Sequence, residues 1–231
     1  MAQKINPTSF RLGINQIWDS SLQIYGKSLT FYFLNINKFL QIRDFLSRSF
    51  ISHNLLFINE EIKINKNKFS LNIYYSYLPK LKKVKNYLFF KKITKVVSQQ
   101  FNANINLRFY FKILETSGTN LLISYAKVLL LQDISSKKIL WNLCKLLEFH
   151  MNSYKLYYSK VGFKKVYLKG FKIRLSGRFN DSKNQMAKSV EQTTGYLPLS
   201  CLKSYVEYGK EEIFTRSGVC GIQVWLFYEL N

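Results

Sequence analysis

The clearest structural signal in the chain is Lys169-Gly-Phe-Lys-Ile-Arg-Leu-Ser-Gly-Arg178, where Phe171, Ile173 and Leu175 alternate with polar or charged residues. This alternation is typical of a β-strand with one buried face. A second alternating segment is Gly218-Val-Cys-Gly-Ile-Gln-Val-Trp-Leu-Phe227. Its Gly-x-x-Gly sequence runs directly into the strand, so it predicts a turn or bulge. Together the segments predict a sheet with one apolar face and one partly cationic face.

Two helices are expected before this sheet. The segment from Leu121 to Leu131 is apolar except for one lysine and fits a buried helix. Ser135 or Ser136 can cap a second helix, whose apolar positions are Ile139, Leu143, Leu146 and Leu147. The segment from Asn180 to Thr194 is expected to form a further helix.

The first half of the chain shows a different order of elements. An amphipathic helix of about three turns is expected from Phe39. It is followed by strands over Leu55–Ile58 and Leu71–Tyr77, a helix from Phe89 to Val97 and a strand from Asn104 to Ile113. A polar cluster between Glu115 and Asn120 marks the boundary with the second half.

The charge balance restricts the classes of function. The 231 residues include 35 Lys and Arg against 13 Asp and Glu, a formal net charge of +22. Such a charge favours a polyanionic partner, and nucleic acid is the first candidate. No membrane partner is expected, because the cations are spread along the chain and the longest apolar run is far shorter than the ~20 residues of a membrane span.

Catalysis and cofactor binding have no support in the sequence. His53 and His150 are the only histidines, and His150 and Cys144 fall on different faces of a helix. No convincing carboxylate pair, metal-ligand set or phosphate-binding loop occurs. Most aromatic residues lie on apolar faces, so only Tyr74 and Tyr110 are candidates for stacking on bases. We expect no enzyme, no cofactor and no metal site.

Both ends of the chain resemble one protein family. The opening Met1-Ala-Gln-Lys-Ile-Asn-Pro-Thr-Ser-Phe-Arg-Leu-Gly13 is similar to the start of the KH-domain-containing protein number three of the small ribosomal subunit. The ordered set Lys169–Arg178, Gly195-Tyr-Leu-Pro-Leu199 and Gly218–Phe227 is similar to that family's C-terminal domain. The resemblance is specific over residues 1–19 and 166–228 and architectural between them.

The resemblance implies an α+β fold in three parts. Residues 1–20 would be an extended arm, residues 21–115 a degenerate type II KH domain, and residues 116–231 a C-terminal α/β domain with a mostly antiparallel sheet packed on helices. The Gly-x-x-Gly loop of KH domains is missing. Pro79-Lys-Leu-Lys-Lys-Val-Lys85 stands in its place, and we expect its lysines to contact phosphates.

The predicted RNA-binding residues are cations. Arginines rank first, because a planar guanidinium can hold a phosphate through two hydrogen bonds. They are Arg11, Arg174, Arg178 and Arg216. The predicted lysines are Lys4, Lys80, Lys82, Lys83, Lys85, Lys155, Lys160, Lys164, Lys165, Lys183 and Lys188.

The resemblance also bears on messenger RNA. Bacterial members present two arginines and a lysine on a helix toward the mRNA entry channel, where they assist unwinding. The matching window here is Asn152-Ser-Tyr-Lys-Leu-Tyr-Tyr158, which keeps only Lys155 as a cation. Unwinding is therefore not expected to carry over, although Lys160, Lys164 and Lys165 are candidates for contact with mRNA.

The implied function is a structural constituent of the small ribosomal subunit that binds the ribosomal RNA (rRNA) of the subunit head and lines the mRNA entry channel. Proteins number ten, fourteen, four and five of the subunit are the implied neighbours. A free RNA chaperone or processing factor is the alternative, and a nuclease is less favoured. The bias toward Lys, Asn, Ile, Phe and Tyr matches AT-rich coding. We therefore expect an organelle-encoded protein of the mitochondrial matrix, with a plastid or bacterial ribosome as alternatives.

Overall fold

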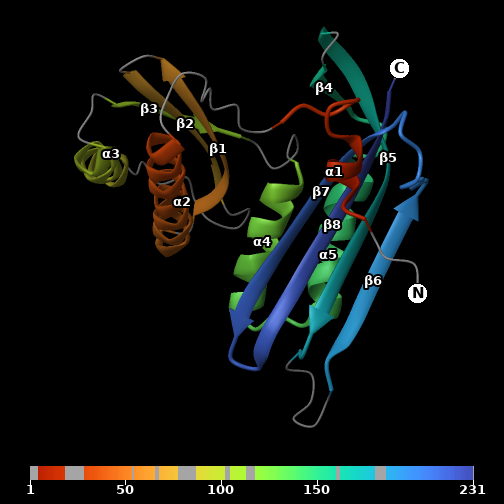
Figure 1. Cartoon of the computed structure of the whole chain (residues 1–231). Coiled ribbons are helices and arrows are strands. Elements are labelled where there is room, and N and C mark those ends of the chain that lie inside the picture. Colours follow the sequence, from red (N-terminus) through yellow and green to blue (C-terminus); the bar gives the residue numbers. More distant parts are fainter. Residues whose placement is uncertain are drawn as a thin grey trace. The chain divides into compact units, whose positions relative to one another are not determined.

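The computed structural model describes residues 5–18, 29–53, 55–65, 68–77, 87–101, 105–112, 118–159, 162–179 and 186–230. The chain forms two compact units (Figure 1). One comprises Asp19–Ile113, and the other comprises Met1–Trp18 together with Leu114–Asn231. The N-terminal residues, which we expected to form a separate arm, thus belong to the unit built from the second half of the chain.

The unit Asp19–Ile113 has the predicted order of elements. It contains α2 (Leu29–Ser52), β1 (Leu55–Asn65), β2 (Lys68–Tyr77), α3 (Tyr87–Phe101) and β3 (Ile105–Phe111). Strands β1 and β2 pair antiparallel, whereas β2 and β3 pair parallel. Parallel neighbours need a crossover connection, and α3 lies in that connection. The assignment of this unit to the KH class stays a prediction.

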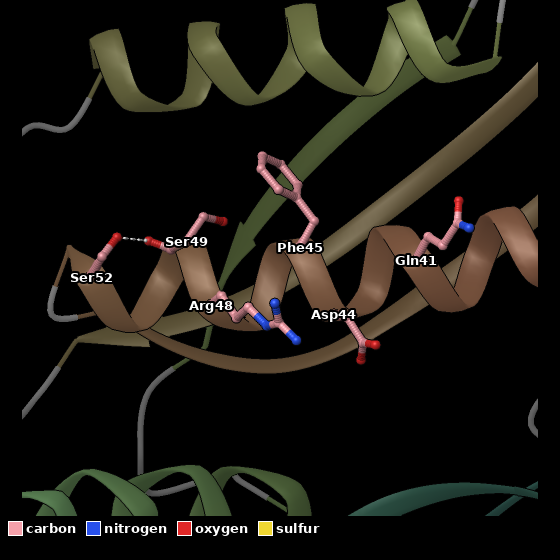
Figure 2. Close-up of a pocket in the computed structure, with 6 residues that line it drawn as sticks. All are labelled: Gln41, Asp44, Phe45, Arg48, Ser49 and Ser52. Carbon is pink, nitrogen blue, oxygen red and sulfur yellow. Dashed lines mark hydrogen bonds between the residues drawn. The ribbon is translucent and has the colours of Figure 1, made fainter.

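One side of α2 provides much of the core of this unit. Ile42, Leu46 and Phe50 are at most 1% exposed. The rings of Phe50 and Phe89 pack edge to face, with their centroids 5.4 Å apart. Another side of the helix lines a shallow hollow with Gln41, Asp44, Phe45, Arg48, Ser49 and Ser52 (Figure 2). The helix is amphipathic as predicted, but its 24 residues far exceed the expected three turns.

The other unit packs two helices on an antiparallel sheet, as predicted. Helices α4 (Thr119–Leu131) and α5 (Ser136–Phe149) cover one face of the sheet (Figure 1). The strands are β4 (Tyr154–Ser159), β5 (Gly162–Gly177), β6 (Lys188–Gly195), β7 (Tyr205–Thr215) and β8 (Gly218–Leu230). Their order is β4-β5-β8-β7, and β6 pairs with the second half of β5. The α+β class is therefore confirmed.

The two faces of this sheet have the predicted difference in polarity. Phe171 and Ile173 of β5 lie opposite Leu226 and Val224 of β8, and all four are at most 1% exposed on the face that the helices cover. The intervening residues of β5 point to the other side, which we call the outer face. Helix α4 approaches the sheet closely, because a Cβ at Gly209 would lie only 2.4 Å from Ile123 Cδ1.

Two predictions of helical structure were wrong. Lys188 begins strand β6 and not a helix, because residues 188–195 pair with the second half of β5. Of the rest of that predicted helix, residues 180–185 lie outside the described residues, and residues 186–187 are not helical. The window Asn152–Tyr158, which we matched to a helix of bacterial relatives, leads into strand β4 instead.

The buried carboxyl group of Glu60 predicts that the stability of the unit Asp19–Ile113 depends on pH. Its Oε2 is buried without a hydrogen-bond partner, and burial raises its pKa from 4.5 to about 7. The folded state therefore holds this proton more tightly than the unfolded state. We expect the free energy of unfolding to fall as the pH rises from about 4.5 to about 7, and to stay lower above that range.

Replacement of Glu60 by Gln tests this expectation. Glu60→Gln should stabilise the protein at pH 8 and flatten the pH dependence in urea titrations, whereas Glu61→Gln, at the exposed neighbouring position, should not. An unchanged pH dependence in Glu60→Gln would exclude this carboxyl group as the cause.

Candidate nucleic-acid interface

Arg11 is a buried structural residue. It ends the short helix α1 (Pro7–Arg11) and has 0% exposure. Its Nε donates to the carbonyl of Ser204 at 3.1 Å, and its Nη2 donates to the carbonyls of Leu199 and Cys201 at 2.9 and 2.6 Å. Burial lowers the pKa of Arg11, but these bonds match a charged guanidinium. No phosphate can reach the group, which corrects the prediction of an RNA contact at Arg11.

Neighbouring polar residues complete this attachment of the N-terminal segment. Asn15 donates to the carbonyl of Leu202, and Gln16 donates to the carbonyl of Val206 in β7. The prediction of an extended arm therefore does not describe residues 5–18. Lys4 lies outside the described residues.

Three predicted cations gather at one end of the sheet. Arg178 follows β5, Lys188 begins β6, and Arg216 lies in the turn between β7 and β8; all three are exposed. Lys188 pairs with the last residue of β5, and the hydroxyl of Ser217 donates to the carbonyl of Arg178 at 2.8 Å. We call Arg178, Lys188 and Arg216 the basic rim. Lys183 lies outside the described residues.

The outer face next to the basic rim mixes both signs of charge. Arg174 Nε lies 3.0 Å and Lys172 Nζ 2.6 Å from the carboxylate oxygens of Glu191, and Lys210 lies 3.2 Å from Glu212. A shallow hollow on this face is lined by Arg174, Ser176, Gly177, Lys210, Glu212, Val219, Gly221 and Gln223. Arg174 thus lies on the predicted face. Its charge is offset by the carboxylate of Glu191, a partner that the sequence analysis did not predict.

The lysines of the β4–β5 hairpin have unequal surroundings. Lys155 forms an ion pair with Glu207, which also accepts from the Tyr205 hydroxyl at 2.9 Å. Burial and then the Glu207 charge raise the pKa of Tyr205. Lys164 is half-buried and Lys165 is exposed. The remaining predicted lysines lie outside the described residues: Lys80, Lys82, Lys83, Lys85 and Lys160.

Within the described residues, no group of three or more His, Cys, Asp or Glu side chains could hold a metal ion. Among the helices in that part of the chain, none combines the length and the apolar character that crossing a membrane requires. The surface chemistry that the described residues do offer is a set of exposed cations on sheet ends and helix faces.

Comparison with known proteins agrees with this picture. A family model of the ribosomal protein S3 C-terminal domain matches residues 157–226. Over 230 residues the chain is 46% identical to the small ribosomal subunit protein uS3m of Chondrus crispus, covering 99% of this chain and 94% of that protein. The chain belongs to the ribosomal protein S3 (uS3) family. The family predicted from the two end motifs is therefore confirmed.

More distant S3 proteins also match over the whole chain. The uS3 of Carsonella ruddii is 28% identical over 234 residues, covering 100% of this chain and 99% of that protein. The uS3 of Pelagibacter ubique is 26% identical over 230 residues, covering 98% and 90%. Membership in this family of structural ribosomal proteins agrees with the prediction that the chain is not an enzyme.

The S3-family chain has further exposed cations that the predicted site set left out. On α3 they are Lys91, Lys92 and Lys95, and on α5 they are Lys137, Lys138 and Lys145. Lys145 also lies over the ring of Trp141 at 5.0 Å, and this ring is 60% exposed. The signal for both sets is in the sequence, because the cations fall between apolar residues at helical spacing.

Arg11→Lys tests the structural role of Arg11. Lysine keeps the charge but cannot reproduce the planar set of donors, so several buried carbonyls lose their partners. We expect a loss of about 2–4 kcal/mol in the free energy of unfolding, measured by urea titration. Ile14→Ala, at a position 59% exposed in the same segment, should change it by less than ~0.5 kcal/mol. A small stability effect with a clear loss of RNA affinity would favour a phosphate contact instead.

Glu191→Gln tests the balance of charge on the outer face. The variant removes the carboxylate shared by Lys172 and Arg174, so both cations become available to phosphates. We expect tighter RNA binding and a steeper dependence of affinity on salt, measured by fluorescence anisotropy. Glu148→Gln removes an exposed carboxylate on α5, away from the outer face, and serves as the control. Equal gains in both variants would point to net charge alone.

Proposed function

We propose that this S3-family chain is a structural constituent of the small ribosomal subunit and binds small-subunit rRNA in the subunit head. The observation that carries the proposal is identity with S3 proteins along the whole chain. The printed names of these relatives refer to the small ribosomal subunit. The net charge of +22 and the exposed basic rim supply the physical means of binding a polyanion.

The basic rim acts through phosphates and not through base edges. Exposed cations on three neighbouring strand ends can each neutralise a phosphate, and the release of bound counterions drives the association. Phosphate contacts position a protein on RNA but carry no sequence information. The rim therefore fixes the sheet on rRNA, while the shape of the folded RNA selects the place.

For mRNA, the first turn of α5 is a better candidate than Lys155. Lys137 and Lys138 are adjacent, exposed cations on a helix. The arginine pair of bacterial members also lies on a helix. Lys155 lies on a strand and pairs with Glu207. Contact with mRNA at the entry channel is thus proposed for α5, with Lys165 on the β4–β5 hairpin as a further exposed cation.

The cellular setting and the neighbours follow from the family. The Chondrus crispus relative carries the name uS3m, which supports a mitochondrial ribosome for this chain. The proposed neighbours are the small-subunit proteins number ten, fourteen, four and five. A free RNA chaperone would use the same cations but would leave the subunit in high salt.

Two measurements test the proposal. Tagged protein should sediment with small subunits in a high-salt sucrose gradient; recovery only at the top of the gradient would favour the chaperone.

The isolated chain should bind RNA with an affinity that falls steeply with salt. Arg178→Ala and Arg216→Ala should each lower the slope of log K against log salt by about 0.7–0.9. Arg48→Ala on α2 is the control for loss of one exposed arginine, and an equal change there would remove the basic rim from the interface.

A further inference from the structure

The β4–β5 hairpin carries a row of large apolar side chains in solvent. Tyr154, Leu156 and Tyr158 of β4 are 66%, 60% and 58% exposed, and Phe163 of β5 is 77% exposed. Tyr158 lies opposite Phe163, and Leu156 lies opposite the exposed Lys165. We call Tyr154, Leu156, Tyr158, Phe163 and Lys165 the aromatic face.

The hairpin is fixed from its other side, so the exposure does not come from poor attachment. Lys155 pairs with Glu207, and Val166 has 0% exposure. The ring of Tyr157 lies 4.0 Å from that of Tyr205, and its hydroxyl donates to the carbonyl of Asn15. The rings of the aromatic face therefore stand on a hairpin whose opposite side is attached to the rest of the unit.

The rings are arranged in two groups. Tyr158 and Phe163 are tilted neighbours with centroids 5.1 Å apart. Tyr154 lies under the Lys165 ammonium, which is 5.8 Å from the ring centroid. Each group can offer one π surface to a flat ligand, and the second group has a cation beside it.

The charge of the surrounding sequence indicates an anionic ligand. Residues 149–180 contain no Asp or Glu, but they contain Lys155, Lys160, Lys164, Lys165, Lys169, Lys172, Arg174 and Arg178. The aromatic face itself combines exposed rings with a cation and contains no carboxylate; Glu229 of β8 lies opposite Tyr167, which in turn lies opposite Tyr154. Rings beside a cation match a ligand with negative charges and flat rings. Single-stranded RNA has both.

We propose that the aromatic face binds unpaired nucleotides of RNA. One base stacks on the Tyr158 and Phe163 pair, another stacks on Tyr154, and Lys165 contacts a phosphate. The site is separate from the basic rim, and it rests on the proposed function only in that its ligand is RNA. Leu156 stands between Tyr154 and Tyr158 on the same side of β4 and is also exposed. Stacking of this kind tolerates any base sequence, because every base has a π surface.

The test compares two ten-nucleotide probes on the full chain by fluorescence anisotropy. One is oligouridylate, and the other has the same phosphates and sugars without bases. The double variant Tyr158→Leu with Phe163→Leu keeps apolar bulk but removes the rings. It should bind oligouridylate about 5- to 100-fold more weakly than the unmodified chain and the abasic probe equally well. Phe149→Leu, at a position 81% exposed on α5, controls for loss of an exposed ring.

Other outcomes overturn the proposal in identifiable ways. Unchanged binding of both probes by the double variant would exclude base stacking at this face. Unchanged binding together with loss of co-sedimentation with small subunits would show that a protein occupies the face. Failure of the unmodified chain to bind even the abasic probe in a salt-dependent way would count against the proposed function. In contrast, an equal loss of affinity for both probes would indicate that the double variant damages the hairpin. The variant Tyr154→Leu then provides the test, because stacking at Tyr154 requires it to weaken binding of oligouridylate and not of the abasic probe.

Discussion

The surfaces of the sheet unit depend on one irregularity in β5. The buried residues of its first half, Val166 and Leu168, stand at even positions, whereas those from Phe171 to Leu175 stand at odd positions. Successive side chains of a regular strand point to opposite faces, so one of these sets would otherwise lie in solvent. The register with β8 shifts between Leu168 and Gly170, and this bulge keeps both sets on the helix-covered face. Glycine is needed there, because a Cβ at Gly170 would lie 2.2 Å from a backbone oxygen.

The same bulge puts the aromatic face and the cationic outer face on one side of the sheet. Lys165 in the first half of β5 and Arg174 in the second half both point away from the helix-covered face. The basic rim follows at the end of the strand, where Arg178 lies. An RNA strand that follows β5 would thus meet rings first and cations afterwards. The proposed ring contacts would resist salt and the proposed cation contacts would not, so the two ends of one strand would contribute binding energies of different kinds.

The sequence predicted the elements whose pattern is local. Alternation predicted β5 and β8, and helical spacing predicted α5, because each buries one face against its neighbours. The apolar run from Leu121 to Leu131 predicted the buried helix α4. Strand β6 was missed because its eight residues are mostly polar and exposed, so no apolar alternation marks it. Pairing with β5 determines its structure, and pairing between distant segments leaves no local pattern. The first half of α2 was missed for a different reason, since residues 29–36 are apolar at most positions and show no helical periodicity.

The roles of individual cations were harder to predict than the fold. A lone arginine in a segment with Pro7 and Gly13 looks the same in sequence whether it meets a phosphate or a set of backbone carbonyls. Arg11 meets carbonyls of residues 199–204, nearly two hundred positions away. The pairing of Arg174 with Glu191 likewise needs the register of β6 against β5, which no spacing within either strand encodes.

The few carboxylates of the sheet unit determine which cations can act on RNA. Glu191, Glu207, Glu211 and Glu212 each pair with a lysine or an arginine, and all four come from β6 or β7. Residues 149–180 supply cations without any acid. Among the described residues, Lys155 pairs with Glu207 of β7, and Lys172 and Arg174 pair with Glu191 of β6. Half-exposed ion pairs of this type contribute about 0–1 kcal/mol, which a phosphate can readily exceed. The pairs on the outer face can therefore open when RNA approaches, whereas the guanidinium of Arg11, enclosed by carbonyls, cannot exchange its partners without the N-terminal segment coming away from the sheet.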